Sequence, residues 1–133
     1  MVSVNWIAIA IATVAAMVAG WLWYGPVLGS AWRRLARDPT PRAAVAYPLA
    51  LVANFVTVFV LACMTTLAFH ESGGPLILRA LVTGLLLWLG FTVARICITA
   101  AFENRSIRLF AIHIGHDLVV TVLAAITIGV VGI

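Results

Sequence analysis

Four long apolar stretches, each about as long as a helix that crosses a lipid bilayer, dominate this sequence. The hydrocarbon core of a bilayer is about 30 Å thick, and a helix spans it with roughly 20 residues while satisfying its own backbone polar groups. The stretches run over residues 6–24, 48–69, 76–102 and 109–131. They predict an all-α protein with a single membrane domain over residues 1–133, built as an integral four-helix bundle.

The composition excludes a water-soluble fold. Apolar residues make up 65% of the chain and charged residues 9%, against about 45–50% and about 25% in soluble domains. The mean hydropathy is +1.19. Because so few charges cannot cover a globule, we expect most of the surface to face lipid.

The basic residues are all arginines, and they are unevenly placed. Most lie in the first and third connections between the apolar stretches: Arg33, Arg34, Arg37, Arg42, Arg105 and Arg108. These two connections share one side of a four-span chain, so the positive-inside rule predicts that they are cytoplasmic and that both termini lie outside. We therefore expect a multi-pass protein of the cell inner (plasma) membrane, with anionic lipid headgroups rather than nucleic acid as the partner of its net charge of +4.

The first connection carries a helical pattern of its own. Apolar residues and arginines fall on opposite faces of a helix around residues 28–37, which predicts a short interfacial helix. Asp38-Pro39 is expected to stop it. We expect the following residues to anchor the chain at the two membrane interfaces: Trp6, Trp23, Tyr24, Pro26 and Trp32.

Small residues recur at every fourth position of the first stretch: Ala8, Ala12, Ala16 and Gly20. They share one helix face and let another helix approach closely. The spacing leaves open whether that neighbour is another span of the chain or a second copy. We expect a homo-oligomer, with this face as its interface.

Five polar residues are expected to form a layer in the cytoplasmic half of the membrane: Asn54, Arg95, His113, His116 and Asp117. Counting from a loop centred on Ser106 places Arg95 and Asp117 at the same depth, about 10–12 Å below the helix ends. A charge at that depth normally finds a partner. The two residues are therefore predicted to form an ion pair.

This layer leaves three functions open. As a proton or small-solute site it indicates a small transporter or channel-like protein, which is the interpretation we favour. As a packing device it indicates a structural or regulatory membrane subunit without transport activity. The spacing His113-x-x-His116-Asp117 also admits metal or haem binding in a redox membrane protein, although a single helix gives a poor ligand set.

Other chemistry has little support in the sequence. No serine or cysteine stands in a recognisable nucleophile elbow, so we expect no enzymatic activity and no catalytic residue. We also expect no metal and no cofactor. Cys63 and Cys97 fall in opposite halves of the membrane by residue count and are not expected to form a disulfide.

Two motifs resemble those of a known family. Asn5-Trp6 and Gly20-x-x-Trp23-Tyr24-Gly25-Pro26-x-x-Gly29-x-x-Trp32 resemble the opening signature of the domain-of-unknown-function 1761 family. Leu109-Phe110-x-Ile112-x-x-Gly115-His116 is similar to its second recurring stretch, with His116 at a position that is often Tyr. The resemblance implies a small bacterial four-span membrane protein and implies no activity or substrate. Physically, Gly25-Pro26 is expected to end the first span, because proline lacks a backbone N–H.

Overall fold

A computed structural model describes residues 2–37, 40 and 42–133. All regular elements in these residues are helices: α1 (Trp6–Leu22), η1 (Trp23–Val27), α2 (Gly29–Leu35), α3 (Ala43–Ser72), α4 (Leu76–Leu87), η2 (Trp88–Val93), α5 (Ala94–Glu103) and α6 (Ile107–Val131). They join into four continuous helices that are long and apolar enough to cross a membrane, Trp6–Val27, Ala43–Ser72, Leu76–Glu103 and Ile107–Val131. The predicted all-α, four-span membrane architecture is confirmed.

Local chemistry fixes where these helices begin and turn. The side chain of Asn5 caps α1, since its Oδ1 accepts from the backbone N–H groups of Ile7 and Ala8 at 3.0 and 3.3 Å. Gly73 and Gly74 supply the positive φ angles of the turn between α3 and α4. Arg79 reaches back to that turn, where its Nε donates to the carbonyl oxygen of Gly73 at 2.6 Å.

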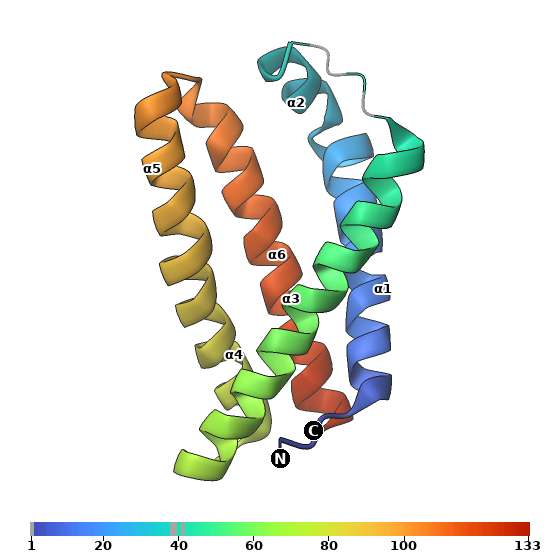
Figure 1. Ribbon diagram of the computed structural model, residues 1–133, viewed down its shortest axis with the longest axis vertical. Coiled ribbons are helices and arrows are strands. Elements are labelled where there is room, and N and C mark those ends of the chain that lie inside the picture. Colours follow the sequence, from blue (N-terminus) through green and yellow to red (C-terminus); the bar gives the residue numbers. More distant parts are fainter. Residues whose placement is uncertain (1, 38–39, 41) are drawn as a thin grey trace.

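The bundle is arranged around α6, which packs between α1 and α4, while α3 covers α1 and α4 from the other side (Figure 1). Both termini and the α3–α4 turn lie at one end of the molecule, which we call the terminal end. The short helix α2 and the α5–α6 turn lie at the opposite end. We call this the Arg-rich end, because it carries Arg33, Arg34, Arg37, Arg105 and Arg108.

The apolar core sits near the terminal end. Its buried residues come from all four spans: Ile9, Ala12, Val58, Leu61, Ala62, Ala80, Ala124, Ala125 and Ile128. Toward the Arg-rich end the helices diverge, as Figure 1 shows for α3 and α5. Within α5 and residues 43–57 of α3, all of which the structure describes, no residue is buried. The bundle is therefore packed at one end and splayed at the other.

Two span boundaries differ from the prediction. The second span begins at Ala43 rather than residue 48 and continues to Ser72. The first span does not stop at Gly25-Pro26, because η1 carries the chain through Pro26 as a π-helical turn. The backbone N–H of Leu28 donates to the carbonyl oxygen of Trp23 at 2.9 Å, a wider loop that bypasses the missing proline donor. The predicted short helix is present as α2, and its expected stop at Asp38 and Pro39 lies outside the described residues.

The small-residue face of α1 packs within the chain. Ala8, Ala12 and Ala16 are at most 1% exposed, and Ala12 belongs to the core. The expectation that this face joins two copies is therefore wrong. It fails because α3 and α6 already occupy the space that a second copy would need, a choice that residue spacing does not encode.

Candidate functional site

Two side chains of η1 tie the first span to α6. The indole Nε1 of Trp23 donates to the carbonyl oxygen of Ile112 at 3.0 Å. The Tyr24 hydroxyl lies 2.6 Å from Nδ1 of His113, a hydrogen bond between side chains 89 positions apart. The π-helical turn places both rings on the α6 side, since it shifts the helix phase at Trp23.

The first span and α6 also pack closely because each has a glycine against which a side-chain ring of the other lies. A Cβ added to Gly115 would lie 3.0 Å from Cζ2 of Trp23, and one added to Gly20 would lie 3.1 Å from Nε2 of His116. The absence of a side chain therefore leaves room for the Trp23 ring on α6 and for the His116 ring on α1. We call the contacts of Gly20, Trp23 and Tyr24 with residues 112–116 the α1–α6 clasp. It unites the two motifs that the sequence analysis singled out.

Tyr24 occupies the centre of an aromatic cluster. Its ring centroid lies 5.0 Å from that of His116, 5.7 Å from that of His113 and 5.3 Å from that of Trp32, the last in an edge-on arrangement. The start of α2 follows closely, because a Cβ on Gly29 would fall 2.8 Å from the carbonyl oxygen of Tyr24. The apolar face of α2 thus packs back onto η1 through Trp32.

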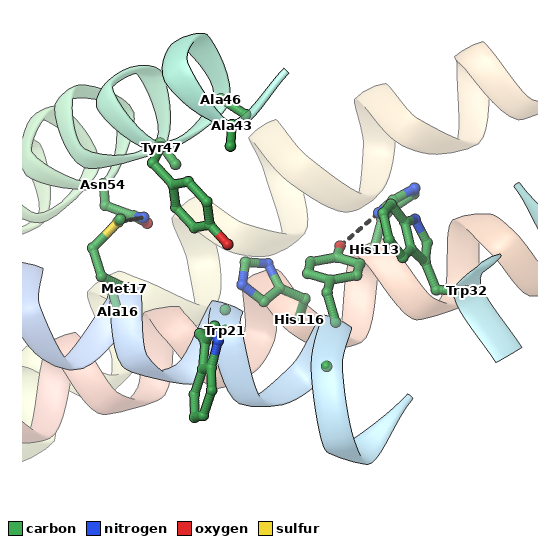
Figure 2. A pocket seen from close by; sticks show the side chains of 14 residues that line it. Ala16, Met17, Trp21, Trp32, Ala43, Ala46, Tyr47, Asn54, His113 and His116 are labelled. Atoms are coloured by element: carbon green, nitrogen blue, oxygen red, sulfur yellow. Dashed lines mark hydrogen bonds between the residues drawn. The ribbon is translucent and has the colours of Figure 1, made fainter. Parts of the chain in front are cut away.

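A cavity of about 600 Å³ opens beside this cluster, between α1, α3 and α6 (Figure 2). Four aromatic side chains line it, Trp21, Tyr24, Trp32 and Tyr47, together with the polar side chains of Asn54, His113 and His116. Tyr47 and His116 project into it from opposite walls in Figure 2. It lies in the Arg-rich half of the molecule, where the core residues are sparse.

The cavity exists because small residues face one another across it. α3 contributes Ala43, Ala46 and Ala50, and α1 contributes Ala16 and Gly20. On α3 the spacing of three and four residues keeps these methyl groups on one face. Since neither wall carries a long side chain at these positions, the diverging helices leave a space that the protein does not fill.

The predicted polar layer forms only in part. Asn54, His113 and His116 line the cavity, and Asn54 Nδ2 makes a 3.4 Å contact with the sulfur of Met17. Arg95 and Asp117 do not line it within the described residues. The structure brings three of the five residues together, from α3 and α6.

The predicted ion pair between Arg95 and Asp117 is wrong. Arg95 is exposed, and in the described part of the chain the Asp117 carboxylate makes a hydrogen bond with His116 instead, at 3.1 Å between Nδ1 and Oδ1. Counting from the loop assumes two regular helices in contact. The π-helical turn η2 changes the phase of the third span before Arg95, so counting back from the loop does not give the face on which Arg95 lies.

His116 carries an unpartnered nitrogen. A carboxylate only accepts, so Nδ1 of His116 donates to Asp117, which leaves Nε2 as the other polar atom of the ring. This Nε2 is buried against Gly20 and has no hydrogen-bond partner among the described residues. In the same part of the chain, no three His, Cys, Asp or Glu side chains gather as ligands of a metal ion.

Sequence reasoning missed Tyr47 and Trp88. Trp88 starts η2 and donates its Nε1 to the carbonyl oxygen of Ile114 at 3.2 Å, so both π-helical turns begin with a tryptophan bonded to the same stretch of α6. The recurrence of Trp-x-Gly at Trp23-Tyr24-Gly25 and Trp88-Leu89-Gly90 was the available signal. Of the expected interface anchors, Trp6 is 61% exposed and stacks on Phe59, whereas Trp23 and Tyr24 are half-buried in the clasp.

The chain matches a family of proteins of unknown function, DUF1761, over residues 7–129. No curated protein and no solved structure matches the chain. The matched range includes every residue of the α1–α6 clasp and every residue named above as lining the cavity.

Proposed function

We propose that the chain, which belongs to the domain-of-unknown-function 1761 family, is a small membrane transporter or channel-like protein that uses the cavity as its solute site. The observation that carries the proposal is the cavity itself. Its volume of about 600 Å³ falls in the range of about 300–1,000 Å³ that small-molecule sites occupy. Such sites are mostly apolar with a few polar groups, and this one combines aromatic rings with Asn54, His113 and His116.

The unequal packing of the two ends of the bundle supports a function in which one part of the bundle moves. The packed terminal end holds the core, whereas α5 and the first half of α3 have no buried residue to fix them among the described residues. Elements with few buried contacts are the ones that open and close at low cost in free energy. We propose that rearrangement of the splayed half changes access to the cavity, from a side that the arginine distribution assigns to the cytoplasm.

Cysteine accessibility tests this proposal. In a chain with Cys63→Ala and Cys97→Ala, Ala46→Cys places a thiol on the cavity wall, and Ala53→Cys places one on an exposed position of the same helix away from the cavity. In liposomes of known orientation, a membrane-impermeant thiol reagent should label position 46 and spare position 53. A transporter should show labelling of position 46 from both sides. Absence of labelling at position 46 would contradict a solvent-accessible solute site.

The alternative is a structural or regulatory subunit, and the α1–α6 clasp favours it. His113 and His116 are each already engaged, with Tyr24 and Asp117 respectively, so these groups also serve helix packing. In that case the cavity would be filled by lipid or by a partner, and position 46 would stay unreactive in the native membrane.

A further inference from the structure

We infer that the cavity selects an organic cation, a protonated or quaternary amine carried on an apolar body. The inference rests on the proposed solute site and names the chemical class of its occupant. Three independent features of the cavity lead to it: its aromatic walls, the sign of the charges around it, and its hydrogen-bonding groups.

Aromatic rings form much of the wall. Tyr24, Trp32 and Tyr47 come from three different elements and face one space. The face of an aromatic ring carries partial negative charge, and rings grouped around a cavity bind quaternary ammonium groups. An apolar body attached to the cation would lie against the alanines of α1 and α3.

The charges near the cavity also favour a positively charged solute. None of its described lining residues is an arginine, although the chain contains eight. Asp117 does not line the cavity but accepts a hydrogen bond from His116, which does. Among the described residues, no arginine lies within 4.0 Å of the Asp117 carboxylate. An intramembrane carboxylate is costly in free energy unless positive charge lies near it. A cation in the cavity would supply that charge across the His116 ring.

The polar groups of the wall can satisfy an ammonium N–H. The Asn54 carbonyl oxygen and the Tyr47 hydroxyl can both accept a hydrogen bond, and neither takes part in one among the described residues. An anionic solute would find no arginine among the described lining residues. The arginines of α2, Arg33 and Arg34, are exposed, so headgroup phosphates would neutralise them.

Protection of a cavity thiol tests the inference. The probes are phenethyltrimethylammonium and its carbon isostere (3,3-dimethylbutyl)benzene, which share shape and differ in charge. With Ala46→Cys in lipid nanodiscs and a small neutral thiol reagent, the ammonium compound should protect the thiol at about a tenfold lower concentration than the isostere, as expected for cation–π and charge attraction. Equal protection by both compounds would overturn the cation assignment and leave the solute site intact. Lack of reaction without any probe would instead contradict the proposed function.

A second variant tests whether the Asp117 carboxylate causes the preference for the cation. Asp117→Asn keeps an acceptor for His116 and removes the negative charge, so the tenfold preference for the cation should fall to near unity while protection by the isostere is unchanged. Glu103→Gln is the matched control, because Glu103 pairs with Arg105 at 3.2 Å at the end of α5. It should keep the preference. A preference that survives Asp117→Asn would show that the carboxylate does not select the solute and would overturn this part of the inference.

Discussion

Glycine determines how closely α6 approaches its neighbours. A Cβ added to Gly129 would lie 2.5 Å from Cα of Ile77, so backbone meets backbone at the start of α4. Gly84 of α4 is equally close to α6, since a Cβ added to it would lie 3.0 Å from Cγ2 of Thr121. In lipid, where no hydrophobic force drives helices together, such close packing is a main source of association.

Gly129→Ala should therefore destabilise the fold. Because the obstructing atom is backbone, α4 and α6 must move apart, and we expect a loss of about 1–3 kcal/mol in the free energy of unfolding. Gly90→Ala is the control, since a Cβ there meets nothing within 4 Å. Denaturant titration in detergent micelles measures both. Equal stability of the two variants would show that α4 and α6 are less close than described.

Substitution of Thr65 should raise the free energy of unfolding, in contrast to Gly129→Ala. Its hydroxyl is fully buried and has no hydrogen-bond partner among the described residues, whereas the neighbouring Thr66 donates to the carbonyl oxygen of Ala62 at 2.9 Å. Thr65→Val removes an unsatisfied polar group at nearly constant volume and should raise the free energy of unfolding by about 1 kcal/mol. Thr66→Val should lower it or leave it unchanged. A loss in Thr65→Val would reveal a partner for that hydroxyl.

The two π-helical turns organise the contacts of α6. η1 directs Trp23 and Tyr24 onto α6, and η2 directs Trp88 onto the carbonyl oxygen of Ile114 in the same helix. The clasp is therefore an interaction between elements, and its energy should be measurable as coupling between residues far apart in sequence.

A pair of double-mutant cycles measures this coupling. Tyr24→Phe and His113→Ala should together cost less than the sum of the single changes, with a coupling of about 0.5–1.5 kcal/mol from the hydrogen bond they share. Arg95→Met and Asp117→Leu form the comparison cycle, and because the two residues make no ion pair, their effects should add. Thermal unfolding of purified variants provides the values. Strong coupling in the second cycle would restore the ion pair that the sequence predicted.

The same elements show which features the sequence can predict. The four spans follow from apolar length, and α2 follows from its two-sided pattern, because both depend on local periodicity. Arg95 was misplaced because a π-helical turn changes the helix phase, and no periodicity rule for regular helices includes it. The cavity was not predicted either, since it depends on how α1, α3 and α6 are placed relative to one another, a property of the assembled bundle. Asn54, His113 and His116 were identified because polar residues in an apolar stretch are conspicuous.

The distribution of arginines predicts how the protein is oriented in the membrane. Ser72 ends α3 at the terminal end, and Ser106 precedes α6 at the Arg-rich end. With both native cysteines replaced by alanine, a membrane-impermeant thiol reagent added outside intact cells should label Ser72→Cys and spare Ser106→Cys. Disruption of the cells should make both react. Labelling in the reverse order would place the Arg-rich end, and with it the cavity, outside.

The unequal packing of the two ends makes the molecule wedge-shaped, so it displaces more lipid from one leaflet than from the other. The lateral pressure of the surrounding acyl chains then acts differently on the two ends. Lipids with small headgroups raise the pressure among the acyl chains and press the splayed helices inward, whereas lipids with large headgroups relieve it. Lipid shape would thereby act like a ligand on the rearrangement that we propose for the splayed half, through its differential interaction with the two forms.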